Sequence, residues 1–279
     1  MNALKQLPAL TLSCPRVWDT LVDQLRTAVT KAGFSDVVLG LSGGIDSALV
    51  ATLAVDAFGA EHIHGVLMPS SFSSQGSVTD ALSLASNLGI STNLISIVPM
   101  YEAFITTLAP HFQGTERDIT EENLQARIRG TLLMAFSNKF DYFVLATGNR
   151  SEALAGYATL HGDMVGGYAP IGTLYKTHVY ELARWKNDTA QRPVIPQDSI
   201  DKEPSAELSV GQLDRHALPP YDVLDAIYYY IIDKGETAEQ LISEGFSRED
   251  VENAVNRQEK SSFKRTYAAP SPKLDIYQK

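Results

Sequence analysis

The sequence predicts an α/β protein with a doubly wound, mostly parallel sheet of five strands flanked by helices, and a helical C-terminal extension. Over about the first 190 residues, short apolar or β-branched runs alternate with stretches of helical periodicity, which is typical of parallel sheets. Polar turns follow two of these runs, as expected where such sheets bind ligands. We therefore predict one domain over residues 1–279, with an α/β core over about 16–190 and an extension over about 191–279.

Composition narrows the class of protein. At 279 residues, with 44% hydrophobic and 20% charged residues, the chain can bury one large core. It has no apolar run long enough to cross a membrane and no N-terminal signal pattern, so we expect a cytoplasmic protein without membrane contact. The net charge of −10 argues against nucleic-acid binding. Cys14 is the only cysteine, which excludes an intramolecular disulfide, and we expect no chemical role for it.

The first predicted elements precede and follow a glycine-rich turn. Residues 16–31 have the apolar spacing of an amphipathic helix, which Gly33 ends. Beyond the turn, residues 61–69 predict a strand ended by a proline. His62 and His64 alternate on one face of that strand. Because no third ligand is near in sequence, we interpret them as a surface or hydrogen-bonded pair rather than a metal site.

The glycine-rich turn is the central feature of the chain. A β-branched run at Val37–Leu39 leads into Gly40-Leu41-Ser42-Gly43-Gly44-Ile45-Asp46-Ser47, and an apolar helical run follows at Ala48–Ala54. A glycine turn entering a helix N-terminus binds anions through its backbone N–H groups. Asp46 stands where the common nucleotide-binding loop carries lysine, and a carboxylate beside phosphates calls for a divalent cation such as Mg²⁺. The alternative is that Asp46 only caps its helix.

The core continues with a helix and a strand. Residues 77–87 predict a helix that Ser77 and Asp80 begin and Gly89 ends. Residues 91–98 predict the next strand.

A longer helix is predicted over residues 118–138. Polar residues four positions apart share a helix face, Asn123 with Arg127 and Gln125 with Arg129. The alternative is an exposed, charged surface. The apolar second half of this helix favours burial, in which case the arginines need an anionic partner such as phosphate or carboxylate.

A strand predicted over residues 142–146 ends in a second polar turn. A helix cap by Asn149 or Ser151 explains every polar residue of this turn except Glu152. Two strand-end loops, one bringing Asp46 and the other Glu152, would supply two carboxylates to a single Mg²⁺ ion.

The remaining segments are a long glycine-rich loop and an irregular C-terminal part. The loop covers residues 156–173, and its length and order favour a functional role. Residues 191–220 are punctuated by prolines, and we interpret them as a loop folding over the site, with a disordered linker as the alternative. The other helices are predicted over residues 176–186, 223–233, 238–243 and 248–259.

Read together, the motifs of this chain resemble those of the NAD⁺ synthetase family, whose ATP loop is of the pyrophosphatase (PP-loop) type. The resemblance runs from about Val17 to Pro270, and no single motif other than the glycine turn is specific. The order and spacing of all the motifs together are specific. They are Ser-Gly-Gly-Ile-Asp-Ser (42–47), Glu-Asn-Leu-Gln-Ala-Arg-Ile-Arg (122–129), Thr-Gly-Asn-Arg-Ser-Glu (147–152), Gly-Asp (162–163), Lys-Thr (176–177), Pro-Ser-Ala-Glu-Leu (204–208), Leu-Pro-Pro-Tyr-Asp (218–222) and Phe-Lys-Arg (263–265).

The resemblance implies a fold similar to the adenine nucleotide alpha hydrolases and a C–N bond-forming ligase that completes NAD⁺ biosynthesis. ATP, as co-substrate with Mg²⁺, would adenylate the nicotinate carboxylate of deamido-NAD⁺, and ammonia would then displace AMP. The resemblance also implies a homodimer that binds deamido-NAD⁺ partly across the interface, with the helix at Asn123–Asn138 contributing to that interface.

The family's functional residues map onto this chain position by position. Asp46, Asp163 and Lys176 would be catalytic, and Asp46 with Glu152 would hold Mg²⁺. ATP would contact Gly40, Ser42, Gly43, Gly44, Asp46, Ser47, Thr147, Lys176 and Ser205. Deamido-NAD⁺ would contact Asn123, Arg127, Asp163 and Lys264.

The chain also departs from its relatives. Arg150 replaces a common lysine, and Arg215 follows Asp214 where an acidic residue is usual. The sequence is similar to the synthetase domain of glutamine-dependent members, yet we expect no amidase domain before it. We therefore expect free ammonia, or ammonia from a separate protein, as the nitrogen source.

Two other functions are compatible with the glycine turn. One is another adenylating amidotransferase or a tRNA-modifying enzyme of the same loop type. Sulfur-transferring members would need catalytic cysteines, and a nucleic-acid substrate would need a basic surface. The other is a nucleotide-sensing module without catalysis, which would be expected to lack Asp46, Glu152 or Asp163, and all three are present.

Overall fold

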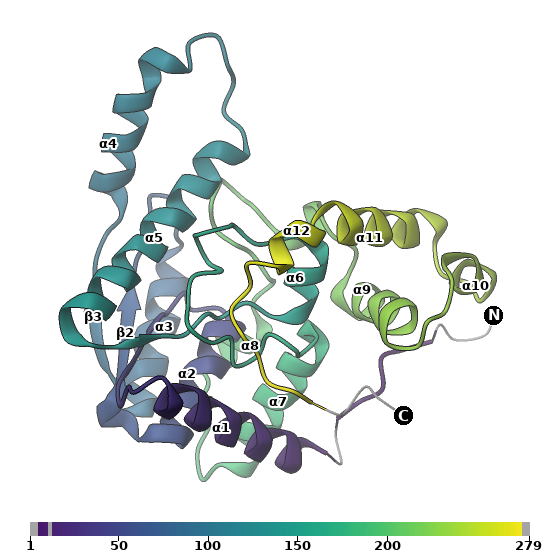
Figure 1. Ribbon diagram of the computed structural model, residues 1–279, viewed down its shortest axis with the longest axis horizontal. Coiled ribbons are helices and arrows are strands. Elements are labelled where there is room, and N and C mark those ends of the chain that lie inside the picture. The colour runs from purple at the N-terminus through teal and green to yellow at the C-terminus, as the bar shows by residue number, and fades with distance from the viewer. Residues whose placement is uncertain (1–4, 11–12, 275–279) are drawn as a thin grey trace.

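The structure is a computed structural model that describes residues 5–10 and 13–274 (Figure 1). At its centre lies a parallel sheet formed by β1 (Val37–Gly40), β2 (Ile63–Leu67), β3 (Ser91–Leu94) and β4 (Phe143–Val144). The strand order is β3-β2-β1-β4, and Val37 pairs with Ile63 on one side and with Phe143 on the other. The sheet order therefore reverses between β1 and β4, and the carboxyl end of this boundary is where ligands are expected.

The prediction of five strands is wrong for the described part of the chain, where the sheet has four strands. At the position of a fifth strand, Leu145 and Tyr168 form a single isolated bridge, and Gly167 N–H donates to the carbonyl of Val144 at 2.8 Å. A Cβ atom at Gly167 would lie 2.3 Å from the ring of Phe143. The chain therefore passes β4 only at glycine, and the contact does not extend into a strand.

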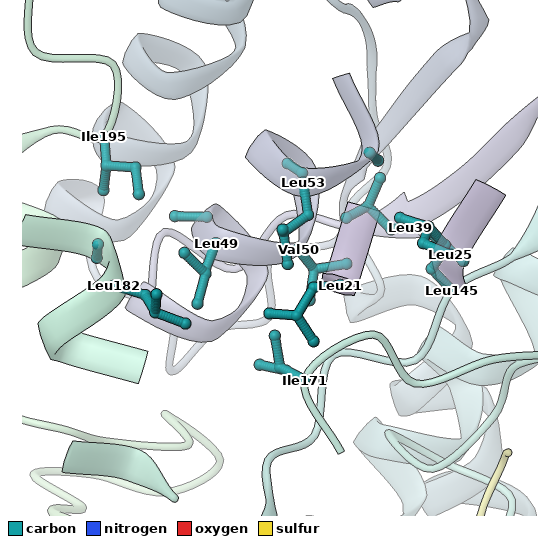
Figure 2. Packing of buried hydrophobic residues seen from close by; sticks show 14 of the residues in the cluster. Leu21, Leu25, Leu39, Leu49, Val50, Leu53, Leu145, Ile171, Leu182 and Ile195 are labelled. Carbon is teal, nitrogen blue, oxygen red and sulfur yellow. The ribbon is translucent and has the colours of Figure 1, made fainter. Parts of the chain in front are cut away.

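Helices cover both faces of the sheet, because residues of β1 alternate between two apolar clusters. Val37 and Leu39 belong to a cluster with α1 (Cys14–Lys31), α2 (Ile45–Phe58) and α7 (Lys176–Thr189). Figure 2 shows Leu39 with Leu21, Leu25, Leu49, Leu53 and Leu182 in this cluster. Val38 faces a second cluster with residues of α4 (Val98–Leu108) and α5 (Ile119–Phe140). This arrangement confirms the prediction of helices on both faces of a parallel sheet.

Several predicted boundaries need correction. The strand expected over 91–98 ends at Leu94, and α4, which the sequence patterns missed, begins at Val98 with a proline in its first turn. Helix α3 (Gln75–Leu88) begins before Ser77, because the Ser74 side chain accepts from the Ser77 N–H at 3.1 Å and caps the helix. Cys14 is the first residue of α1 rather than preceding it. It is buried, and burial raises the pKa of its thiol to about 11, consistent with no chemical role.

The C-terminal part forms its own helical layer, shown in green and yellow at the right of Figure 1. Helix α9 (Tyr221–Tyr228) continues into a π-helical turn, η4 (Tyr229–Asp233), and packs with α10 (Ala238–Ser243) and α11 (Arg248–Lys260) around a separate apolar cluster.

Residues 191–220 contain α8 (Gln197–Asp201) and η3 (Asp214–His216), so this segment is ordered and is not a disordered linker. The other elements are η1 (Ala60–His62), η2 (Ala109–His111), α6 (Arg150–Ala155) and α12 (Ser262–Arg265).

Within the described residues, no helix combines the length and the apolar character that a membrane crossing requires.

Candidate active site

A cavity of about 360 Å³ opens at the carboxyl ends of the strands. It is lined by the glycine loop (residues 40–47), the end of β2, the inner side of α5, the turn after β4 and the start of α7. A covering segment (residues 203–214) forms its far wall. The cavity therefore lies where the two polar strand-end turns were expected to meet.

The glycine loop is preformed by its own hydrogen bonds. Gly43 has a φ of +80°, and a Cβ atom there would lie 2.2 Å from the carbonyl oxygen of Ser77. Only glycine satisfies both conditions. Ser47 Oγ accepts from the Ser42 N–H at 3.2 Å and donates to the carbonyl of Gly44 at 3.1 Å. The loop thus presents the N-terminus of α2 to the cavity in a form ready to bind an anion.

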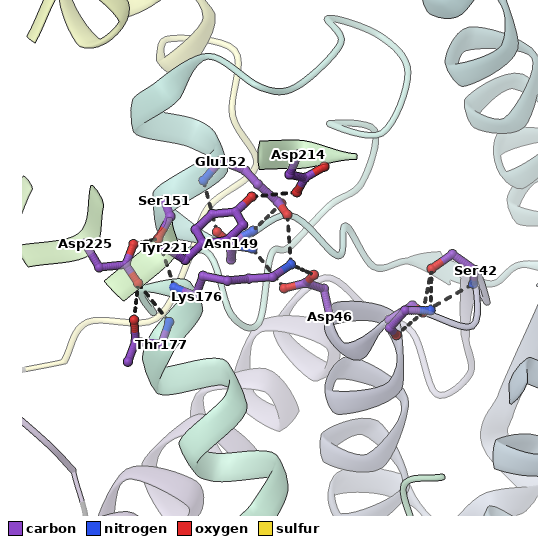
Figure 3. Close-up of polar contacts among 12 residues, drawn as sticks. Ser42, Asp46, Asn149, Ser151, Glu152, Lys176, Thr177, Asp214, Tyr221 and Asp225 are labelled. Carbon is purple, nitrogen blue, oxygen red and sulfur yellow. Dashed lines mark hydrogen bonds and ion pairs between the residues drawn. The ribbon is translucent and has the colours of Figure 1, made fainter. Parts of the chain in front are cut away.

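Asp46 does not cap its helix. Gly44 is the N-cap of α2, and no side chain makes the capping hydrogen bond. The Asp46 carboxylate instead accepts from Asn149 Nδ2 at Oδ1 (2.8 Å) and from Lys176 Nζ at Oδ2 (Figure 3). The capping alternative for Asp46 is therefore excluded.

Lys176 lies between the two predicted metal ligands. Its ammonium group contacts Asp46 Oδ2 and lies 3.3 Å from Glu152 Oε1. Its side chain is only 4% exposed. Burial alone would lower the pKa of Lys176, but attraction to Asp46 and Glu152 outweighs it and raises the pKa above the usual value. The sequence did not predict that a lysine would bridge the two carboxylates.

Glu152 has two functions in the turn after β4. The Asn149 side chain accepts from the Glu152 N–H at 3.0 Å and Glu152 Oε2 accepts from the Asn149 N–H at 3.2 Å, a capping box. The cap is thus made by Asn149 rather than Ser151, and the prediction that a cap leaves Glu152 unexplained is wrong, because Glu152 is part of the capping box. The other oxygen of Glu152 faces Lys176. Burial, with repulsion from Asp46, raises the pKa of Glu152 to about 8.

We call the part of the cavity formed by Asp46, Glu152, Lys176 and Asp214 the cavity floor. The carboxylates of the cavity floor outnumber its ammonium groups. Asp214, which is 5% exposed, adds a third carboxylate, and burial raises its pKa. No three His, Cys, Asp or Glu side chains among the described residues form a ligand set for a metal. Mg²⁺, however, commonly uses one or two carboxylates together with phosphate oxygens. The hard oxygen donors of Asp46 and Glu152 beside the glycine loop fit that chemistry.

A second group of predicted residues braces the long loop after α6. Asp163 Oδ1 accepts from the Thr159 N–H at 2.6 Å, and the hydroxyl of Thr159 donates to Asn123 Oδ1 at 2.7 Å. Lys264 Nζ donates to the carbonyls of Gly156 (2.8 Å) and Ala158 (2.7 Å). Burial raises the pKa of the Asp163 carboxyl and lowers that of Lys264. These contacts bring the C-terminal segment to the cavity.

Most of the predicted site residues line the cavity, and two do not. Gly43 lies on the side of the glycine loop that packs against Ser77 of α3, away from the cavity. Arg127 is exposed on α5, where its Nε donates to the carbonyl of Leu160 at 3.2 Å. The lining residues are Gly40, Ser42, Gly44, Asp46, Ser47, Asn123, Thr147, Glu152, Asp163, Lys176, Ser205 and Lys264.

Among the charged cavity residues that were not selected from the sequence are Arg129 and Asp214. Arg129 lines the cavity and donates from Nε to the carbonyl of Met68 at 3.0 Å, and burial lowers the pKa of its guanidinium to about 10. The signal for it was its shared face with Gln125, which is 1% exposed. Asp214 accepts from the hydroxyl of Tyr221 at 2.8 Å. Arg215, which follows Asp214, argues against a role for this loop when the sequence is considered alone.

The covering segment folds over the cavity as predicted. Ser205 Oγ donates to the carbonyl of Gln212, which shapes the turn. Glu207 is anchored to the start of α3, where its carboxylate accepts from the Ser74 N–H at 3.0 Å and from Ser77 Oγ at 2.7 Å. A carboxylate is favoured at a helix N-terminus. Glu207 therefore fixes the covering segment to the start of α3.

His62 and His64 lie away from the cavity. Both approach Asp36 Oδ1, at 3.4 and 3.1 Å, and His64 stacks on Tyr142 with ring centroids 3.9 Å apart. The predicted surface or hydrogen-bonded pair is therefore observed, with one carboxylate shared by both rings.

Comparisons with known proteins find similar sequences and similar folds. A family model described as NAD synthase matches residues 17–268. The chain is 50% identical to the glutamine-dependent NAD(+) synthetase of Thermotoga maritima over 254 residues, which cover 91% of this chain and 44% of that protein. The chain thus spans about half the length of the curated relatives it matches.

Two similar solved structures match along nearly their whole length. One is the NH3-dependent NAD synthetase of Campylobacter jejuni in complex with nitrate ion, at 30% identity and a TM-score of 0.74, covering 91% of this chain and 96% of that chain. The other is the NMN synthetase of Francisella tularensis, at 30% identity and a TM-score of 0.77, with the same two coverages.

Proposed function

The chain belongs to the NAD synthase family, and from this membership we propose that it amidates deamido-NAD⁺ at the expense of ATP. ATP adenylates the nicotinate carboxylate and releases pyrophosphate, and ammonia then displaces AMP to form NAD⁺. The observation that carries the proposal is the convergence of Asp46, Glu152 and Lys176 beside a preformed anion-binding loop in one cavity.

The chemistry needs positioning and charge neutralisation more than covalent catalysis. A carboxylate accepts a nucleophile poorly until one of its oxygens becomes a good leaving group, which adenylation provides. Backbone N–H groups of the glycine loop would hold the phosphates of ATP, and Lys176 would offset negative charge that develops on the transferred phosphate. Asp46 and Glu152 would hold Mg²⁺, which supplies further neutralisation of the phosphate oxygens when bound.

The second substrate would occupy the other half of the cavity. Asn123, Asp163 and Lys264 would contact deamido-NAD⁺, and Asp163 would orient ammonia. Arg129 is the buried cation best placed to receive an anionic group there.

A homodimer is part of the proposal. Large apolar side chains are exposed on both helices of one face of the sheet, Phe104 on α4 and Ile119, Met134 and Phe140 on α5. Such a surface is typical of a protein interface. Arg127, exposed on α5 outside the cavity, would then contact deamido-NAD⁺ where the partner subunit completes the site.

We propose ammonia as the nitrogen donor, either free or from a separate protein. Purified chain is expected to form AMP only when ATP, deamido-NAD⁺ and ammonium are all present. Efficient turnover with glutamine in place of ammonium would contradict the proposal that ammonia is the nitrogen donor. Faster turnover of nicotinate mononucleotide than of deamido-NAD⁺ would instead favour a reaction like that of the NMN synthetase relative.

The raised pKa of Glu152 predicts a pH dependence. Because the pKa of Glu152 is raised to about 8, we expect a growing share of this carboxyl to carry a proton as the pH falls below that value, which weakens it as a metal ligand. We therefore expect kcat/KM for magnesium-ATP to rise with pH up to about 8 and then level off. Glu152→Gln should remove this rise and lower the plateau. Identical pH–rate profiles for the two proteins would contradict the assignment.

A further inference from the structure

We propose that Asp225 and Asp233 form a clamp that positions Lys176 and Glu152 for the reaction, an inference that rests on the proposed function. Both carboxylates belong to the helical layer that follows the covering segment, Asp225 on α9 and Asp233 at the end of η4. Each binds one residue at the start of α6 and one at the start of α7, the two helices that carry Glu152 and Lys176.

Helix α7 has no cap of its own. Its N-cap residue, Tyr175, makes no capping hydrogen bond from its side chain, yet the first N–H groups of a buried helix need acceptors. The Lys176 N–H donates to Ser151 Oγ at 2.8 Å, and the Thr177 N–H donates to Asp225 Oδ2 at 2.8 Å. The acceptors therefore come from two other segments of the chain.

Asp225 joins the two helix starts through its two oxygens (Figure 3). Its Oδ2 also accepts from the hydroxyl of Thr177 at 2.6 Å, while its Oδ1 accepts from the hydroxyl of Ser151 on α6. Asp225 and Ser151 are both 0% exposed. Ser151 precedes Glu152 and Thr177 follows Lys176, so Glu152 and Lys176 are each next in sequence to a residue bound to Asp225.

Asp233 repeats the pattern beside it. Its Oδ1 accepts from Arg150 Nη2 and its Oδ2 from the Tyr175 hydroxyl, both at 2.6 Å. The Arg150 guanidinium also lies over the Tyr175 ring, 4.8 Å from its centroid. Arg150 thus holds α6 against α7. Asp233 is the last residue of the π-helical turn η4, and such turns often occur at functional sites.

The clamp acts on catalysis through the distance between Lys176 and Glu152. That 3.3 Å contact lies between the starts of α6 and α7. The Lys176 N–H bond to Ser151 Oγ joins the two starts directly, and Asp225 and Asp233 each bind both of them from the helical layer. Loosening the helix starts would displace Lys176 Nζ from the developing charge while leaving the glycine loop intact. A positioning residue of this kind should affect kcat more than the KM for ATP.

The test is Asp225→Asn, which keeps the volume but replaces an acceptor oxygen by a donor facing Ser151. We expect kcat to fall about 10- to 100-fold, as for other supporting contacts, with the KM for ATP within about threefold of wild type. Thr177→Ser should behave as wild type, and Thr177→Val, which lacks the hydroxyl, should lose an intermediate share of kcat. If Asp225→Asn fails to fold, the comparison of Thr177→Ser with Thr177→Val decides whether the clamp contributes to kcat.

Asp56→Asn is the matched control. Asp56 also joins two helices, accepting from Trp18 Nε1 of α1 at 2.8 Å and from Lys186 Nζ of α7, but it does not line the cavity. Its loss should lower thermal stability without changing kcat. A kcat loss in Asp225→Asn no larger than in Asp56→Asn, or Thr177→Val and Thr177→Ser with equal kcat, would overturn the clamp.

Amide hydrogen exchange separates failure of the clamp from failure of the proposed function. Exchange at Lys176 and Thr177 should become faster in Asp225→Asn and Thr177→Val, whatever substrate the protein uses. Unchanged exchange at these amides would overturn the clamp. If wild type does not turn over deamido-NAD⁺, the proposed function fails, and the exchange result still decides whether Asp225 holds the two helices.

Discussion

Asp46→Asn is expected to reduce turnover at least about 100-fold while leaving the fold intact. Asparagine keeps the size of the side chain and can still accept from Lys176 or Asn149, so the packing around the start of α2 should survive. The negative charge that would pair with Mg²⁺ is lost. Because Asp46 does not cap its helix, no capping contribution to stability is lost with it. AMP release under saturating substrates, with a thermal melt of the same sample, measures both effects.

The control for this variant is Asp23→Asn. Asp23 is an exposed aspartate on α1 that pairs with Arg26 at 2.8 Å. Its replacement should change neither turnover nor the melting temperature measurably, because exposed ion pairs contribute little. Wild-type turnover in Asp46→Asn would remove Asp46 from the metal site and from the reaction.

Lys176→Met is expected to have the larger effect, a loss of turnover of at least about 1000-fold. Methionine matches the length of the lysine stem and fills the same space, but it lacks the ammonium group. Asp46 and Glu152 would then face each other without a cation between them, and Glu152 would keep its proton to still higher pH. The transferred phosphate would lose the cation that lies between Asp46 and Glu152.

Lys186→Met provides a control on the same helix. Lys186 pairs with Asp56 and lies over the ring of Trp18, 4.7 Å from its centroid, on the side of α7 away from the cavity. We expect its turnover to stay within about twofold of wild type even if its melting temperature falls. Equal losses in the two variants would mean that Lys176 supports the helix rather than the reaction. Restored turnover of Lys176→Met at high Mg²⁺ would assign its charge to phosphate neutralisation.

Much of the fold was predictable because its signals are local. The boundaries of α10 at Ala238–Ser243 and the end of α1 at Lys31 match the sequence patterns, since capping residues and apolar spacing lie within a few positions of each other. Such signals do not show that the sheet of the described residues stops at four strands. Whether residues 167–168 extend the sheet depends on the ring of Phe143, which packs on Gly167 and is distant in sequence.

The candidate site divides in the same way. The strand-end position of Asp46 and Glu152 follows from the order of strands and turns, and the cavity contains both. The sequence did not show whether Arg127 or Arg129 lines the cavity. Both lie on α5, and which of them faces the cavity depends on how that helix packs against the rest of the chain. Arg129 turns toward the cavity and Arg127 toward the exposed surface near Leu160.

The sequence by itself determined the glycine loop, the capped turn that carries Glu152, the covering segment and the family to which the chain belongs. The tertiary structure alone decided that Lys176 lies between Asp46 and Glu152, 130 positions from the first of them. It also decided that Ser151 and Asp225 accept from the first N–H groups of α7, a helix that has no cap of its own. The physical reason is that backbone propensities act over a few residues, whereas buried charges find their partners only when distant segments pack together.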